Sequence, residues 1–174
     1  MSKYLELVKD FHQTFNHPVE TVIKEDNMED RELRLKLLYE ELEELSNAMG
    51  TDEVLHSLCK DTLLKPVNKG VYDKVETLDA LCDIQYVLSG AVLTLGYTNV
   101  FDDTFEEVQR SNMSKMCLSK QQVDDTIKFY KEVKGEKLDI DYTKIDNGYI
   151  VLREDNKILK NVHYSPANIG QFIK

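Results

Sequence analysis

A long amphipathic pattern between residues 28 and 49 constrains the fold of this chain more than any other feature. The apolar side chains that recur there at intervals of three and four are Leu35, Leu38, Leu42, Leu45 and Met49. This spacing is the period of an α-helix with one apolar face. Asn27 precedes the pattern as a candidate N-cap, and Gly50 follows it as a candidate helix stop. The pattern therefore predicts a helix over residues 28–49.

The rest of the chain also favours helices, because its 174 residues include only seven glycines and three prolines. Periodicity and capping signals predict further helices over residues 3–15, 52–63, 72–95, 101–116 and 119–133, with a loop around Pro66 and Gly70. Two short β-patterns, at 149–152 and 157–160, flank a turn at 154–156 and predict a small hairpin. We therefore expect an all-α bundle of five to six helices with a small C-terminal β-hairpin.

The length of the chain fits one core. We expect an all-α domain over residues 1–135. The remaining residues, 136–174, are expected to form an extension that packs on the same domain or on a partner subunit.

The charge balance narrows the class of partner. The chain carries 32 acidic and 22 basic residues, for a net charge of −10. A nucleic-acid backbone is usually bound by a basic face, so this balance argues against nucleic acid. It suits a protein that concentrates cations and takes a small substrate arriving with a metal ion.

Cysteines and hydropathy indicate a cytoplasmic protein. The cysteine count is odd, at three, and no two form a C-x-x-C pair, which argues against a disulfide framework or a zinc knuckle. The first 15 residues lack the apolar core of a signal peptide. The apolar run over residues 80–97 contains several polar residues, so we interpret it as a buried helix and expect no membrane association.

Carboxylates gather on one side of the first long helix. Glu40, Glu41 and Glu44 are spaced so that they lie within reach of one another on a helix. A run of like charges is more often a solvated face than a binding site. The run alone therefore decides nothing.

A second set of carboxylates changes that balance. Glu76, Asp79 and Asp83 are three and four residues apart, which places them on one face of the helix predicted over 72–95. Asp83 is the only charged residue in the 18-residue run from 80 to 97, where burial is costly unless the carboxylate is paired or bound to metal. A lone surface aspartate is the alternative. If the two acidic faces meet, they form a cage of oxygen ligands suited to Mg²⁺.

A third cluster follows on the helix predicted over 101–116. Arg110, Asn112 and Lys115 carry side chains of the kind that hold phosphate oxygens. The alternative is a helix end with favourable cations. The chain has no H-E-x-x-H zinc motif and no G-x-x-x-x-G-K phosphate loop.

Together these motifs resemble the all-α nucleoside triphosphate pyrophosphohydrolases, in particular the MazG-like, phosphoribosyl-ATP-pyrophosphohydrolase-like branch. Residues 40–44 match the first motif, E-E-x-x-E, and residues 78–90 match the second. The stretch 105–115 matches F-x-E-V-x-x-S-N-M-S-K, and residues 156–160 and 164–168 also look like that branch. One position departs from the pattern: where the family reads E-x-x-D, Ala80 stands three residues before Asp83.

The resemblance implies hydrolysis between the α- and β-phosphates of a nucleotide, yielding a monophosphate and pyrophosphate. It implies Mg²⁺ as the cofactor, with Mn²⁺ as a substitute, and assembly into a homodimer or a dimer of dimers. It assigns metal binding to Glu41, Glu44 and Asp83, with Asp79 or Glu76 completing the set in place of Ala80. It leaves Glu40 as a further ligand or as the base toward water. Asn112 and Lys115 would hold phosphate or sugar oxygens, with Arg110 as a helper.

Three functions follow as alternatives. The first is a (d)NTP pyrophosphohydrolase that removes unwanted nucleotides. The second is a helical interaction module that has kept the fold and lost the site, which the Ala80 departure favours. The third is a phosphoribosyl-ATP pyrophosphohydrolase, which the long segment after Lys115 disfavours. The preferred base and sugar cannot be read from the residues.

Overall fold

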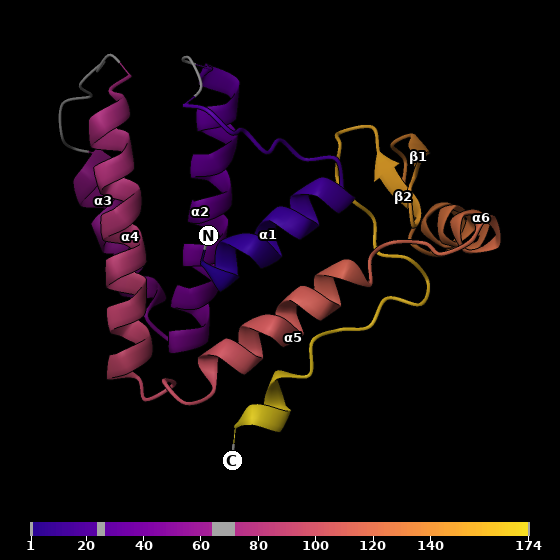
Figure 1. Ribbon diagram of the computed structural model, residues 1–174. Coiled ribbons are helices and arrows are strands. Elements are labelled where there is room, and N and C mark those ends of the chain that lie inside the picture. The colour runs from indigo at the N-terminus through magenta and orange to yellow at the C-terminus, as the bar shows by residue number, and fades with distance from the viewer. Residues whose placement is uncertain (1, 24–26, 64–71, 174) are drawn as a thin grey trace. The chain divides into compact units, whose positions relative to one another are not determined.

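The computed structural model describes residues 2–23, 27–63 and 72–173, with side chains described outside 61–63. The described residues form six α-helices, a π-helical turn, a two-stranded sheet and a 3₁₀ turn (Figure 1). In chain order these are α1 (Lys3–Thr14), α2 (Met28–Met49), α3 (Asp52–Leu63), α4 (Lys74–Thr94), α5 (Phe101–Met113), α6 (Lys120–Lys128), the π-helical turn Phe129–Val133, β1 (Ile140–Ile145), β2 (Gly148–Arg153) and the 3₁₀ turn Ile169–Phe172. The predicted all-α bundle with a small C-terminal hairpin is confirmed.

Contacts within the chain group the residues into two compact units. The first unit comprises residues 1–19 and 86–174, and the second comprises residues 20–85. Helix α4 passes from the second unit into the first between Gln85 and Tyr86. The boundary expected at residue 135, between an all-α domain and a C-terminal extension, does not coincide with either end of the second unit and stays a prediction.

Local capping fixes the helices of the second unit. The Asn27 side-chain oxygen accepts hydrogen bonds from the backbone N–H groups of Glu29 and Asp30, at 3.0 and 3.3 Å, and so starts α2. Gly50 ends α2 in the left-handed conformation, with φ of 66°, which a residue with a Cβ adopts only at a cost. Asp73 caps α4 by accepting from the N–H groups of Val75 and Glu76. Helices α2 and α3 begin and end where the sequence predicts, while the loop expected around Pro66 lies outside the described residues.

The second unit has no apolar core among its described residues. Ser46 is its only buried residue in that part of the chain. The apolar face of α2 is open instead, and Leu35 and Leu42 are 69% and 48% exposed. The stripe that predicts the helix is therefore present, but the described residues of this unit leave it half exposed.

The first unit holds the core of the described chain. Cys117, Val123, Val151 and Leu159 pack together, which joins α6 to β2 and to the segment after the sheet. On the other side of the unit α1 packs on α5, where the Tyr4 ring meets Phe105 edge-on at a centroid distance of 4.8 Å. This packing ties the N-terminal helix to a helix about a hundred residues further along the chain.

The hairpin differs from the expectation in its pairing. Strand β2 contains the predicted segment 149–152, but it pairs along its length with β1, through the turn Asp146–Asn147. The segment predicted as its partner, 157–160, touches β2 on the opposite edge through one bridge between Leu152 and Ile158. Cys117 occupies the Tyr149 end of that edge, so residues 157–160 meet only its far end, where the Leu159 N–H donates to the Val151 carbonyl and the Arg153 N–H donates to the Lys157 carbonyl.

Helix α5 is shorter than predicted and ends at Met113 instead of residue 116. The chain turns there because Cys117 exchanges two backbone hydrogen bonds with Tyr149, at 2.9 and 2.7 Å. Asn161 donates to the carbonyl groups of Ser114 and Met116 and holds the turn. None of the described helices combines the length and the hydropathy that a membrane span requires.

Candidate functional site

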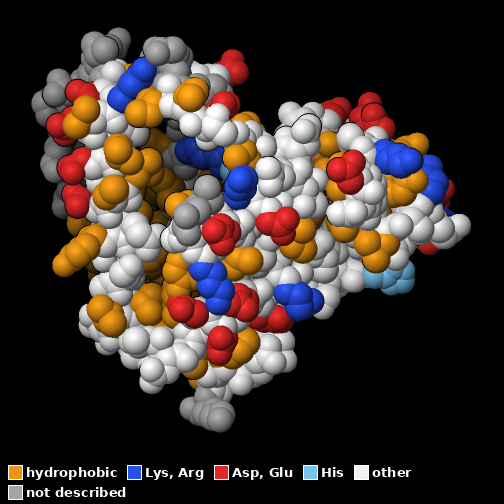
Figure 2. Space-filling view, in the orientation of Figure 1, with side chains coloured by type: hydrophobic (Ala, Val, Ile, Leu, Met, Phe, Trp, Pro, Cys, Tyr) orange, Lys and Arg blue, Asp and Glu red, His pale blue; other side chains and the backbone are white. Residues whose placement is uncertain are grey.

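A groove between α2 and α4, entirely within the second unit, is the candidate site. It has a volume of about 980 Å³, which is in the range of small-molecule sites. Figure 2 shows a hollow there with hydrophobic side chains in its walls. Its lining comprises Asn27, Asp30, Arg31, Arg34, Leu35, Leu37, Leu38 and Glu41 from the α2 side, and Tyr72, Asp73, Glu76, Thr77, Ala80, Leu81 and Ile84 from the α4 side.

The two helices run in the same direction along this groove (Figure 1). At one end the Arg31 guanidinium lies over the Tyr72 ring, 5.0 Å from its centroid. At the other end Glu41 and Ile84 line the groove. Because parallel helices rise equally per residue, Glu41 lies at about the level of Asp83. Of the second set of carboxylates, Asp83 is therefore at the Glu41 end of the groove, while Glu76 lies nearer to Tyr72.

The structure brings two of the predicted carboxylates into the groove. Glu41 lines it from α2 and Glu76 lines it from α4. The other predicted acidic residues, all exposed and outside the lining, are Glu40, Glu44, Asp79 and Asp83. Across residues 2–23, 27–60 and 72–173 no three acidic, histidine or cysteine side chains come close enough to hold one metal ion. The metal-ligand assignment therefore stays a prediction.

The donors at this end fit Mg²⁺ by their chemistry. They are carboxylate oxygens, the hard ligands that Mg²⁺ prefers, and neither histidine nor cysteine lines the groove. Of the two candidates to replace the missing acid at Ala80, Glu76 lies in the groove lining and Asp79 does not. Which of the two completes the set stays a prediction.

Arg110, a predicted substrate-binding residue, is engaged elsewhere in the first unit. Its guanidinium forms a two-pronged ion pair with Glu107, at 2.7 and 2.8 Å, and donates to the Ser165 hydroxyl and the Pro166 carbonyl oxygen. Hydrogen bonds from Arg110 and from the Asn168 backbone lower the pKa of Glu107 to about 2. This network fastens the C-terminal segment to α5, so the substrate role of Arg110 stays a prediction.

The two other predicted substrate-binding residues also lie in the first unit. Asn112 is half-buried in the last turn of α5. Lys115 follows the helix end, and its ammonium group lies 5.6 Å from the centroid of the Phe11 ring. Both therefore sit where α5 meets α1, and their approach to a substrate is also untested.

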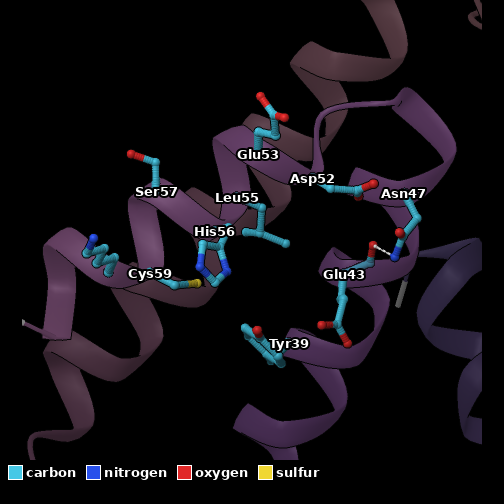
Figure 3. A pocket seen from close by; sticks show the side chains of 10 residues that line it. Tyr39, Glu43, Asn47, Asp52, Glu53, Leu55, His56, Ser57 and Cys59 are labelled. Atoms are coloured by element: carbon cyan, nitrogen blue, oxygen red, sulfur yellow. Dashed lines mark hydrogen bonds between the residues drawn. The ribbon is translucent and has the colours of Figure 1, made fainter.

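A second cavity, of about 570 Å³, lies between α2 and α3. Figure 3 shows Tyr39 and Glu43 of α2 facing His56 and Cys59 of α3 across it. The pKa of Tyr39 is raised by its charge interaction with Cys59, which is the larger cause, and by that with Glu43. Residues 39 and 43 lie on the side of α2 opposite to Arg34 and Leu38 in the groove. None of the predicted site residues lines this cavity, so the groove remains the candidate site.

Comparison with known proteins identifies the family of the chain. A family model for phosphoribosyl-ATP pyrophosphohydrolase matches residues 8–112, which is more than half of the chain. The chain belongs to this family. The matched range includes both helices of the groove, and it places the chain among hydrolases of nucleotide pyrophosphate bonds.

Two individual proteins are similar over nearly the full length. An uncharacterized protein of Acanthamoeba polyphaga mimivirus is 26% identical over 238 aligned residues, which cover 97% of this chain and 95% of that protein. The crystal structure of a candidate NTP pyrophosphohydrolase from Exiguobacterium sp. 255-15 superposes with a TM-score of 0.58 at 22% identity, covering 98% of this chain and 92% of that one. This second similarity establishes a shared fold.

Sequence reasoning missed the other end of the groove. Arg31, Arg34 and Glu41 are spaced three and seven residues apart, which places them on one face of a helix. That spacing was the available signal for the two arginines. Tyr72 carries no comparable signal, because only the packing of the segment before α4 brings its ring beneath Arg31.

Proposed function

We propose that the chain is a Mg²⁺-dependent nucleoside triphosphate pyrophosphohydrolase that cleaves (d)NTPs between the α- and β-phosphates and removes unwanted nucleotides. The observation that carries this is the α2/α4 groove, which Glu41 and Glu76 line, with Asp83 at about the level of Glu41. Membership of the pyrophosphohydrolase family supports the reaction class. Mn²⁺ is expected to substitute, because it accepts the same oxygen ligands.

The predicted site residues would have different roles in such a reaction. Glu41, Glu44 and Asp83, with Asp79 or Glu76 as the fourth carboxylate, would hold the cation. When bound, Mg²⁺ supplies positive charge that offsets the phosphates and makes a water molecule more acidic. Glu40 lies on α2 next to these ligands, as the candidate base that takes the proton from the attacking water. The products would be a nucleoside monophosphate and pyrophosphate.

A second copy of the chain is the partner we propose. The described part of the second unit buries no apolar side chain, although its helices carry continuous apolar stripes. Large apolar residues that lie outside the groove lining are also open, including Leu42, Leu45, Met49, Val54, Leu58 and Leu78, at 41–60% exposure. A helical unit of this kind needs a cover for its apolar faces. Pairing of these faces in a homodimer, or in a dimer of dimers, leaves the groove for the substrate.

The test is pyrophosphate release from a panel of the canonical NTPs, dNTPs and dUTP, with Mg²⁺, with Mn²⁺ and with EDTA. We expect release from at least one (d)NTP that requires the metal and falls at least 100-fold in Glu41→Ala and in Asp83→Ala, because removing a metal ligand removes electrostatic stabilisation of the transition state. Glu132→Ala, an exposed carboxylate of the π-helical turn, is the matched control and should keep full activity.

A second candidate substrate is favoured by the description of the matching family, phosphoribosyl-ATP. Adding it to the same panel separates the two. Turnover of phosphoribosyl-ATP alone would replace the (d)NTP assignment. No metal-dependent turnover of any nucleotide would favour the non-catalytic interaction module that the Ala80 departure suggests.

A further inference from the structure

The end of the α2/α4 groove opposite Glu41 holds a cation–aromatic pair, and Asp30 and Asp73 line the same end. The Arg31 guanidinium lies over the Tyr72 ring, 5.0 Å from its centroid, and both residues are half-buried. Such a pair presents two flat surfaces, a guanidinium plane and an aromatic face, on which a further planar ring can stack.

Apolar side chains line the groove between this pair and Glu41. Leu35 and Leu38 of α2 face Leu81 and Ile84 of α4 across the groove. These four apolar side chains do not solvate phosphate groups, because a charged group against them loses its hydration without gaining a partner. The polar residues of the same stretch are Arg34, Glu76 and Thr77. The apolar side chains suit the uncharged, flat part of a ligand.

The length of the groove matches a ligand with two unlike ends. Ten residues of helix separate Arg31 from Glu41, which is about 15 Å along the axis. A nucleotide held by its phosphates near Glu41 and Asp83 can therefore extend its base along the apolar walls toward Arg31 and Tyr72. One end of the groove would then bind the phosphates and the other end would bind the base of the same substrate.

We propose that Arg31 and Tyr72 form the platform on which the nucleobase of the substrate stacks, and that they determine base preference. This proposal rests on the function proposed above, since it concerns the same groove. Stacking on an aromatic side chain tolerates any base, and the Arg31 guanidinium adds donors for the carbonyl oxygens at the base edge. A base with carbonyl acceptors toward that edge is therefore expected to bind most tightly.

The test is equilibrium binding of the two reaction products, measured separately by calorimetry on the full chain with Mg²⁺ present. Tyr72→Ala is expected to weaken the binding of nucleoside monophosphates by roughly 5- to 100-fold, the usual effect of removing one stacking ring. Pyrophosphate, which has no base, should bind within twofold of the unaltered chain. Tyr72→Phe keeps the ring and should keep the affinity. Arg31→Ala should reduce the differences in affinity among the monophosphates of different bases.

Tyr86→Ala is the matched control, because Tyr86 lies on α4 outside the groove lining and is 81% exposed. Circular dichroism of each variant checks that helix content is retained. The proposal is overturned if Tyr72→Ala leaves monophosphate affinity unchanged, if pyrophosphate affinity falls in parallel, or if the unaltered chain binds no nucleoside monophosphate at millimolar concentration. The proposed function fails separately, if the unaltered chain binds monophosphates through Tyr72 yet releases pyrophosphate from no nucleotide.

Discussion

At the scale of single residues, a close backbone contact requires glycine at position 148. Gly148 begins β2 directly beside the strand-like bridge between Cys117 and Tyr149. A Cβ added at Gly148 would collide with the carbonyl oxygen of Cys117, which is backbone and cannot move aside alone. The two chain segments can pair here only because residue 148 has no side chain.

We therefore expect Gly148→Ala to destabilise the first unit by about 2–3 kcal/mol, which is typical of overpacking a tight site. Urea unfolding followed by circular dichroism measures the change. Gly170→Ala is the control, since its added Cβ meets no atom within 4 Å and its φ is not in the left-handed region. Equal stability of the two variants would show that the Cys117–Tyr149 bridge has room to adjust.

At the scale of elements, the C-terminal segment is held on α5 by a few charged and polar contacts. Glu107 accepts from Arg110 and from the Asn168 backbone, while the Ser111 and Tyr164 hydroxyls are 2.9 Å apart. The Ser114 hydroxyl, just after the helix, is the hydrogen-bond acceptor for the Ser165 backbone N–H. These contacts fasten residues 164–168 to α5.

The low pKa of Glu107 predicts how this attachment responds to acid. A carboxyl group whose pKa falls from 4.5 to about 2 on folding contributes stability that is complete above its unfolded pKa. That contribution declines as the pH falls from about 4.5 toward 2. Hydrogen exchange at residues 164–172 should therefore lose protection over this range. In Glu107→Gln the protection should be weaker at pH 7 and should lose this acid-dependent step.

Glu132→Gln is the control for this experiment, because Glu132 is exposed and its ion pair with Lys128 is long, at 4.0 Å. Full protection of residues 164–172 in Glu107→Gln would contradict the attachment described here.

At the scale of the whole molecule, the two units differ in what holds them together. The first unit closes a core around Cys117, Val123, Val151 and Leu159. The second unit, in its described residues, buries only Ser46. Since burial of apolar surface is the main favourable term in folding, the described part of the second unit needs apolar contacts beyond those that its own residues make with one another.

Sedimentation of the purified chain should accordingly show a dimer or a dimer of dimers at micromolar concentration. Leu45→Glu, which places a charge on the open stripe of α2 outside the groove lining, is expected to shift the distribution toward monomer. Leu118→Glu is the matched control, because Leu118 is 67% exposed in the first unit. If the unaltered chain is monomeric at every concentration, a second copy of the chain cannot be what covers these apolar faces.

What the sequence by itself determined was local: where most helices begin and end, and which residue types lie on each face. Asn27 and Gly50 bound α2 as expected, because capping and left-handed turns depend on neighbours within a few residues. Spacing also placed each set of carboxylates on one face of its helix, for the same reason.

Only the tertiary structure decided which segments meet. It paired β2 with β1, it tied Arg110 to Glu107 and the C-terminal segment, and it placed Tyr72 beneath Arg31 at the end of the groove. Each of these contacts joins residues whose match depends on packing and loop geometry, which helical periodicity and capping do not encode. The groove therefore became visible in three dimensions, although both of its walls were readable as separate helices in the chain.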